Sequence, residues 1–141
     1  MKKILLLLCF GILISLAANP HNEKVIYMAE SPVFRPLEAL WDASTHVESS
    51  NNDRALNLKE MAFGCVQIRA VRLEDYNRRT GKSYKLTDCY NREISKEIWL
   101  YYSIKFYPLD YESICKSWNG RGKSNEVYWH KIKKRLDTKN T

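Results

Sequence analysis

Apolar side chains recur at helical spacing through most of the chain. The first run begins at Pro36, and proline favours the first turn of a helix because its ring fixes φ and its missing N–H needs no partner there. The residues that follow on one helical face are Leu37, Leu40, Trp41, Ser44 and Val47. This pattern predicts a helix that starts at Pro36, buries that face and ends at about Glu48.

Five more segments are predicted to be helical from the same spacing. They cover approximately residues 58–62, 67–79, 89–106, 111–118 and 125–136. Asp88 and Asp110 precede two of them, and each can cap a helix because its carboxylate accepts hydrogen bonds from the first free backbone amides. Within the longest segment, Ile98 and Tyr101 are expected to lie in the core.

Polar residues separate these segments. Ser49 to Asn57 is dense in Ser, Asn and Asp, which hydrogen-bond to their own backbone and are typical of a loop. Residues 80–83, Thr-Gly-Lys-Ser, are typical of a turn. No segment alternates convincingly between apolar and polar residues, as a half-buried strand does. We therefore predict an all-α (mostly α) fold in a single domain.

The N-terminus has the layout of a secretory signal peptide. Lys2 and Lys3 precede an apolar run from Ile4 to Leu16, and the small residues Ala17 and Ala18 follow it. The run is shorter than the roughly 20 apolar residues that span a bilayer. We therefore predict an exported protein with a signal peptide over 1–18, an irregular leader over 19–33, one folded domain over 34–136 and a tail over 137–141.

Charge narrows the expected surroundings of the protein. The formal net charge is +7, and it falls to +5 when Lys2 and Lys3 leave with the predicted signal peptide. A modest basic excess of this kind favours polyanionic surroundings such as a bacterial envelope. One cationic cluster, Lys131, Lys133, Lys134 and Arg135, lies on the last predicted helix. We interpret it as a solvated helix face and predict no nucleic-acid partner, because the sequence contains no matching recognition motif.

Three cysteines remain after the predicted cleavage: Cys65, Cys89 and Cys115. An odd number permits at most one internal disulfide, and the spacing does not select a pair. None of the intervals resembles the close pairs of a zinc site, and the histidines available to complete one are His21, His46 and His130. We predict no metal and no cofactor.

Three short segments carry candidate chemistry. His46 to Asn51 contains Glu48, which the end of a predicted helix places near the negative pole of the helix dipole, where the pKa of a carboxyl rises. Ala62 to Ile68 contains Gly64 and Gln67, and Ser117 to Gly122 contains two glycines. Each segment alone is weak evidence of a functional site. Motifs this short often occur by chance, and a carboxylate at a helix end is ordinarily a solvated charge.

Taken in order, these segments resemble the motifs of the lytic transglycosylase domain of the soluble type, in the lysozyme superfamily. The family pattern is a helix ending in Glu-Ser, then Gly-Leu-Met-Gln-Ile, then Ala-Tyr-Asn-Ala-Gly and a closing helix with a tyrosine. The matching parts of this chain are Glu48-Ser49, Gly64 to Ile68, Ser117 to Gly122 and Tyr128. Cys65 and Val66 replace Leu-Met, and Trp118 replaces the motif tyrosine with an indole N–H and a ring for stacking.

The resemblance implies that residues 34–136 form a lysozyme-like catalytic domain with a catalytic cleft between helices. It implies a peptidoglycan lytic transglycosylase in the periplasm or cell envelope of a bacterium, cleaving the MurNAc-GlcNAc β-1,4 bond and forming 1,6-anhydroMurNAc. Glu48 would act first as acid and then as base, with the substrate's acetamido group as nucleophile. The implied partners are peptidoglycan strands, and a small domain without an obvious wall-binding module is compatible with service to an envelope-spanning machine.

The resemblance also assigns roles to residues around Glu48. The implied substrate-binding residues are Ser49, Gln67, Trp118, Asn119 and Tyr128. A helix-end cap is an equal alternative for Ser49, and core packing is a strong one for Tyr128. Met61 and Phe63 are candidates for the apolar walls that would raise the pKa of Glu48.

Two other functions stay open at the level of sequence. A hydrolytic muramidase of the same fold would need a second carboxylate, such as Asp53 or Glu60, to activate water. A catalytically silent glycan-binding module would keep only the scaffold, and the replacements at Cys65 and Trp118 motivate this alternative.

Overall fold

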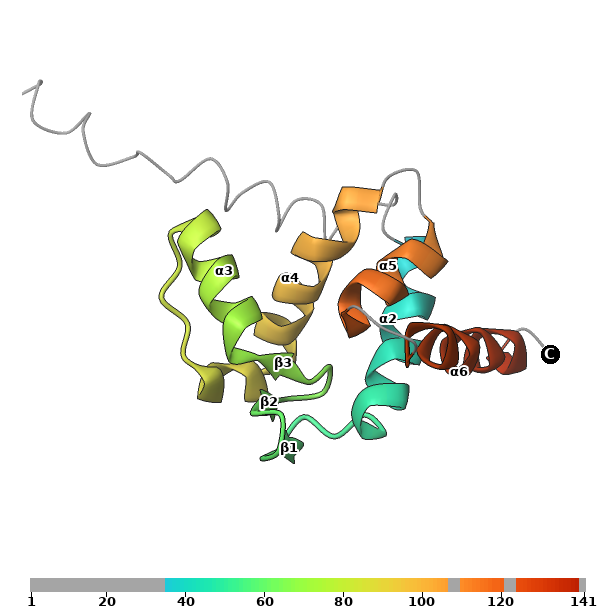
Figure 1. Ribbon diagram of the computed structural model, residues 1–141, viewed down its shortest axis with the longest axis horizontal. Helices are drawn as coiled ribbons and strands as arrows, with labels where there is room; N and C mark the ends of the chain where they lie inside the picture. Colours follow the sequence, from blue (N-terminus) through green and yellow to red (C-terminus); the bar gives the residue numbers. More distant parts are fainter. Residues whose placement is uncertain (1–34, 107–109, 121–123, 140–141) are drawn as a thin grey trace, which may run out of the picture.

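The computed structural model describes residues 35–106, 110–120 and 124–139, and the protein is mostly helical over these residues (Figure 1). Some predicted features lie outside the described residues. They are the signal peptide, the leader, Pro108, and Arg121 and Gly122 at the end of the third candidate segment, Ser117 to Gly122. The α-helices are α2 (Arg35–Ser49), α3 (Ala70–Thr80), α4 (Arg92–Ser103), α5 (Tyr111–Asn119) and α6 (Ser124–Lys139). The mostly helical class predicted from the sequence is therefore confirmed.

Helix α2 follows the predicted pattern closely. Leu37, Leu40, Trp41 and Ser44 are buried, and Val47 packs against the core from a partly buried position. Trp41 meets Trp99 of α4 edge to face, with ring centroids 5.5 Å apart. Glu48 lies in the last turn of the helix, as its sequence position predicts.

The predictions of a short helix over 58–62 and of no strands are wrong. Three two-residue strands, β1 (Leu56–Asn57), β2 (Ala62–Phe63) and β3 (Ile68–Arg69), form an antiparallel sheet in which β2 is central. The turn between β1 and β2 closes when the Glu60 N–H donates to Asn57 Oδ1. Met61 adopts φ +48°, which breaks any helix at that point.

Helix α3 begins three residues later than predicted. Gln67 has φ +54°, and the two residues after it pair with β2, so the helix can start only at Ala70. It ends at Thr80, where Gly81 takes φ 74° and its N–H donates to the Asn77 carbonyl. The turn predicted at residues 80–83 is confirmed at Gly81, whereas Thr80 still belongs to the helix.

Helix α4 starts after a separate 3-10 turn, η2 (Leu86–Tyr90). Asp88 accepts from the Lys85 N–H within this turn, and Asn91, not Asp88, caps α4 by accepting from the N–H groups of Glu93 and Ile94. After α4 the chain tightens into η3 (Ile104–Phe106). The single helix predicted over 89–106 is therefore divided into three elements.

The last two helices agree better with the sequence. Asp110 caps α5 by accepting from the Ser113 N–H, as predicted, and the helix ends one residue beyond Trp118. Helix α6 extends to Lys139, so most of the predicted tail is helical. The α6 helix packs against α5 and α2 (Figure 1).

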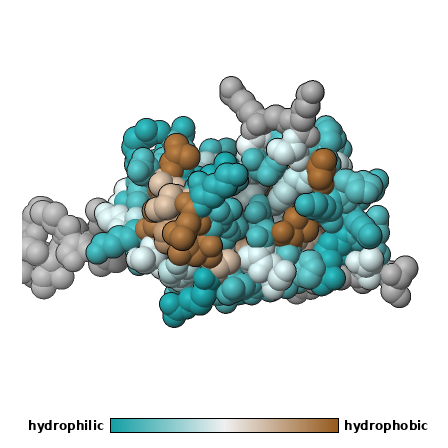
Figure 2. Space-filling model, turned by 60° about the horizontal axis from the view of Figure 1, so that its bottom comes forward, coloured by the Kyte–Doolittle hydropathy of each residue, from teal (hydrophilic) through white to brown (hydrophobic). Residues whose placement is uncertain are grey.

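The core lies between these helices, and all three cysteines of the predicted mature chain are free and buried in it. Ile98 is buried, and Tyr101 packs against the core from a partly exposed position. On the face shown in Figure 2, apolar side chains form small areas among polar ones. Among the described residues, no helix is long and apolar enough to cross a membrane.

Candidate active site

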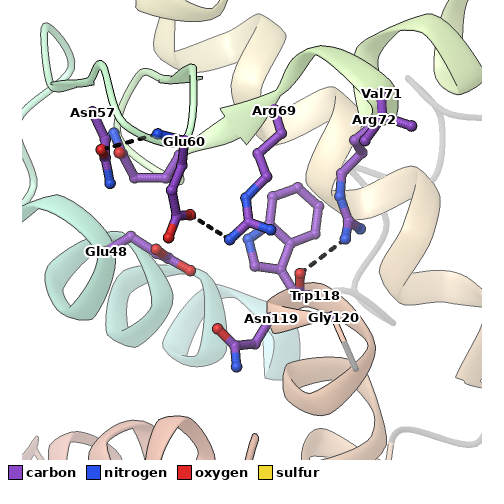
Figure 3. A pocket seen from close by; sticks show the side chains of 10 residues that line it. Glu48, Asn57, Glu60, Arg69, Val71, Arg72, Trp118, Asn119 and Gly120 are labelled. Atoms are coloured by element: carbon purple, nitrogen blue, oxygen red, sulfur yellow. Dashed lines mark hydrogen bonds and ion pairs between the residues drawn. The ribbon is translucent and has the colours of Figure 1, made fainter. Parts of the chain in front are cut away.

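A cleft of about 400 Å³ brings residues from distant parts of the chain together (Figure 3). Its walls come from the end of α2, the sheet, the start of α3 and the end of α5. The lining residues are Glu48, Asn57, Glu60, Gln67, Arg69, Val71, Arg72, Trp118, Asn119 and Gly120. The cleft therefore joins the three candidate segments, although Ser49 and Tyr128 are not part of its lining.

The Glu48 carboxyl is electrostatically unusual. Burial raises its pKa to about 7, even though Tyr128, Arg69 and Arg72 act in the opposite direction. Glu60, across the cleft, adds a smaller upward contribution. Met61 and Phe63, the predicted apolar walls, are not among the residues that line the cleft: Met61 is 48 % exposed, and Phe63 packs against Tyr90 with ring centroids 5.7 Å apart.

Tyr128 lies next to Glu48 but does not line the cleft. Its ring is buried in the core, and its hydroxyl lies near Glu48 and Ser44 without forming a hydrogen bond of good geometry with either. Burial and the neighbouring Glu48 raise the pKa of this phenol, which keeps it protonated. Tyr128 thus combines the core-packing role with proximity to the acid.

Ser49 links the end of α2 to the second motif, Gly64 to Ile68, through a hydrogen bond. Its hydroxyl donates to the Cys65 carbonyl at 2.8 Å and accepts from the Asn52 N–H at 3.1 Å. Both interactions are with the protein's own backbone. Ser49 therefore positions the neighbouring Glu48, in agreement with the helix-end alternative.

The second motif needs its glycine for space as well as for conformation. Gly64 has φ +78°, and a Cβ at this position would lie 2.0 Å from the Cys89 carbonyl oxygen. Three residues later, Gln67 also has positive φ, and its Nε2 donates to the Gly64 carbonyl at 2.9 Å. The backbone and this hydrogen bond together hold the Gln67 amide at the cleft wall.

Trp118 acts mainly within the protein. Its Nε1 donates to the Val66 carbonyl at 3.2 Å, and the guanidinium of Arg72 lies 4.2 Å from the ring centroid. The side chain is 7 % exposed. The stacking surface expected for substrate is therefore used by Arg72, which the ring holds in the cleft wall.

Asn119 and Gly120 form part of the cleft wall at the end of α5. Asn119 Nδ2 donates to Asn125 Oδ1 at 2.8 Å and to Ser124 Oγ at 3.2 Å, and these side-chain hydrogen bonds link α5 to α6. Gly120 has φ +95°, but a Cβ there would meet no atom of the described residues within 4 Å. The backbone conformation therefore accounts for the glycine at this position.

Sequence reasoning offered Glu60 as a candidate second acid but missed Arg69 and Arg72, which line the same cleft. Glu60 and Arg69 form an ion pair across its upper wall, and Arg72 lies beside them (Figure 3). Both arginines follow Gln67 closely, so their nearness to that motif was the available signal. Asp53, the other candidate second acid, pairs with Arg92 at 2.9 Å and does not line the cleft.

No protein-family model, curated protein or solved structure matches the chain. The chemistry that this site can support follows from the cleft itself. Its described residues offer one protonatable carboxyl with a pKa near neutrality, a second carboxylate engaged by Arg69, and hydrogen-bonding side chains on several walls.

Proposed function

We propose that this chain is a lytic transglycosylase that cleaves the MurNAc-GlcNAc β-1,4 bond of peptidoglycan, on a lysozyme-like fold. The observation that carries the proposal is Glu48, a carboxyl with a pKa of about 7 in the wall of a polar cleft that also contains Gln67 and Asn119. A general acid works best when its pKa lies near the working pH. The motif resemblance supplies the substrate class.

The first step uses Glu48 as acid. Its proton passes to the glycosidic oxygen as the bond from that oxygen to C1 of MurNAc breaks. The carbonyl oxygen of the substrate's 2-acetamido group bonds to C1, so the protein need not supply a nucleophile. Glu48 is left as a carboxylate, which Arg69 and Arg72 stabilise electrostatically.

The second step uses the same residue as base. The Glu48 carboxylate takes the proton of the C6 hydroxyl, O6 bonds to C1, and the bond between C1 and the acetamido oxygen breaks. The product is 1,6-anhydroMurNAc, and Glu48 regains its proton without consuming water. We place this reaction in the periplasm or cell envelope, on peptidoglycan strands and in the service of an envelope-spanning machine.

Product analysis tests the proposal directly. Purified mature protein incubated with sacculi is expected to release muropeptides with 1,6-anhydro ends, identified by mass spectrometry. Reducing MurNAc ends without anhydro products would contradict transglycosylation. Intact sacculi after prolonged incubation would instead favour the catalytically silent glycan-binding module.

A hydrolytic muramidase is the second candidate because Glu60 lines the same cleft as Glu48. In that reaction Glu60 would activate water on the opposite side of the sugar. Its ion pair with Arg69 stands against this role, since the pair engages the carboxylate needed as base.

The pH dependence of activity separates the two mechanisms. Because the acid of the free enzyme has a pKa of about 7, kcat/KM is expected to be flat at lower pH and to fall about tenfold per pH unit above 7. A hydrolase that also needs an ionised base would lose activity at the acid end as well. Rates on solubilised glycan strands, measured at constant ionic strength, give the profile, and a second loss at low pH would contradict the single-residue mechanism.

A further inference from the structure

Arg72 carries a positive charge in the cleft wall that no carboxylate of the described residues neutralises by direct pairing. Its Nη2 donates to the Trp118 carbonyl at 2.8 Å and to the Ser117 carbonyl at 3.3 Å, and both acceptors are neutral. Among the ion pairs of the described residues, none includes Arg72. A cation that is partly removed from water without a counter-ion is costly, so the position favours an anion from outside.

The nearby acids are already engaged. Glu60 pairs with Arg69, and Asp75, on the next turn of α3, pairs with Arg78 and Arg79. Tyr102 donates to Asp75 as well, at 2.9 Å. Glu48 faces the same cleft, but it is protonated in the state that begins the reaction.

The guanidinium of Arg72 is held in place by two aromatic rings, and some of its N–H donors are not used within the described residues. It lies 4.2 Å from the ring centroid of Trp118 and 5.0 Å from that of Tyr102, which fixes it between α3, α4 and α5. The described hydrogen bonds use Nη2 alone, so Nε and Nη1 have no partner among the described residues. A planar guanidinium fixed in this way suits a carboxylate, whose two oxygens match its N–H groups.

Arg72 also lies where the cleft continues. A second hollow is lined by Val71, Arg72, Tyr102 and Ser117 among others, and it shares Val71 and Arg72 with the cleft that contains Glu48. A substituent on a sugar bound at Glu48 can therefore extend past Arg72 along the surface.

We propose that Arg72 binds a carboxylate of the substrate and forms an anion-recognising subsite beside Glu48. The inference rests on the proposed function, which names a substrate with such groups. In peptidoglycan the carboxylate comes from one of two sources: the free lactyl group on MurNAc, or the stem peptide attached to it. The subsite would make the enzyme select acidic muramoyl chains over neutral glycans.

Binding to the full mature chain carrying Glu48→Gln tests the subsite without turnover. The probes are a GlcNAc-MurNAc tetrasaccharide with free lactyl carboxylates, its bis-methylamide, and the form bearing stem peptides. Calorimetry is expected to show affinity for at least one carboxylate probe about 10–100-fold above that for the methylamide. Preference for the free-lactyl probe identifies that source, preference for the peptide-bearing probe identifies the stem peptide, and equal affinity for all three overturns the proposal.

Variants localise the effect. Arg72→Gln is expected to remove the preference, Arg72→Lys to retain part of it, and the matched control Arg79→Gln, on the exposed face of α3, to leave it unchanged. An Arg72→Gln protein that keeps the preference overturns the assignment. Because Arg72 also links α3 to α5, its variants are checked by thermal unfolding, and the partial loss in Arg72→Lys decides the assignment if the glutamine variant does not fold.

Cleavage of sacculi by the unaltered protein keeps the two proposals separate. Anhydro products without any carboxylate preference would overturn the subsite and leave the proposed function standing. A carboxylate preference without cleavage would retain the subsite and overturn the function.

Discussion

Replacing Glu48 with glutamine is expected to lower the turnover of sacculi by about 10²–10⁴-fold while glycan binding persists. The amide keeps the shape of the side chain but cannot donate a proton to the leaving oxygen or accept one from the C6 hydroxyl. Because the proposed mechanism uses Glu48 in both steps, no other described residue is expected to restore the rate. Release of muropeptides, quantified by chromatography, measures the loss.

Glu60→Gln is the matched control, since it removes a carboxylate from the same cleft. It is expected to retain activity within about tenfold, because Glu60 has an electrostatic influence on Glu48 but no step of its own. Loss of activity in both variants would support the two-carboxylate hydrolase, and full activity in Glu48→Gln would overturn both mechanisms.

Glu48→Gln is also expected to change the stability of the protein, and this effect is independent of catalysis. The pKa of Glu48 is about 7 in the folded protein and about 4.5 for an unperturbed glutamate, so the protonated form is the one that the fold favours. Its stabilising contribution is complete below about pH 4.5 and is lost as the pH rises through 7. Glu48→Gln is therefore expected to match the original Tm at low pH and to exceed it at about pH 8. A variant that is less stable at high pH would contradict the burial of the carboxyl.

Local physical signals predicted most of the helical framework. Asp110 caps α5 and Gly81 ends α3 because both effects depend on neighbouring residues. The sheet escaped prediction because a strand of two residues cannot display an alternating pattern. Its path depends instead on positive φ at Met61 and Gln67, which only the assembled loop imposes.

The candidate site shows a similar division. Glu48, Gln67 and Asn119 were predicted from short motifs, and the structure brings them to one cleft. The functions of Trp118 and Arg72 could not be read in this way, because their contact joins residues 46 positions apart in the chain. The sequence shows that Trp118 has a ring suited to stacking. Only the folded structure shows that the guanidinium of Arg72 lies over that ring.

Gly64→Ala is expected to destabilise the protein by about 3–5 kcal/mol, combining backbone strain at φ +78° with overlap in a packed site. The added Cβ would lie 2.0 Å from the Cys89 carbonyl oxygen, and backbone cannot yield as a flexible side chain does. The segment must therefore move, taking with it the Gly64 carbonyl that holds Gln67 and the Cys65 carbonyl that holds Ser49. Denaturant unfolding measures the first effect and glycan cleavage the second.

Gly120→Ala separates overlap from strain. Gly120 also has positive φ, but its Cβ would meet no atom of the described residues within 4 Å, so only the conformational cost of about 1–3 kcal/mol is expected. The additional decrease in unfolding free energy in Gly64→Ala, relative to Gly120→Ala, then measures the energetic importance of the contact between the second motif and η2. Equal unfolding free energies in the two variants would show that this contact does not hold the motif, and the position of Gln67 would need another explanation.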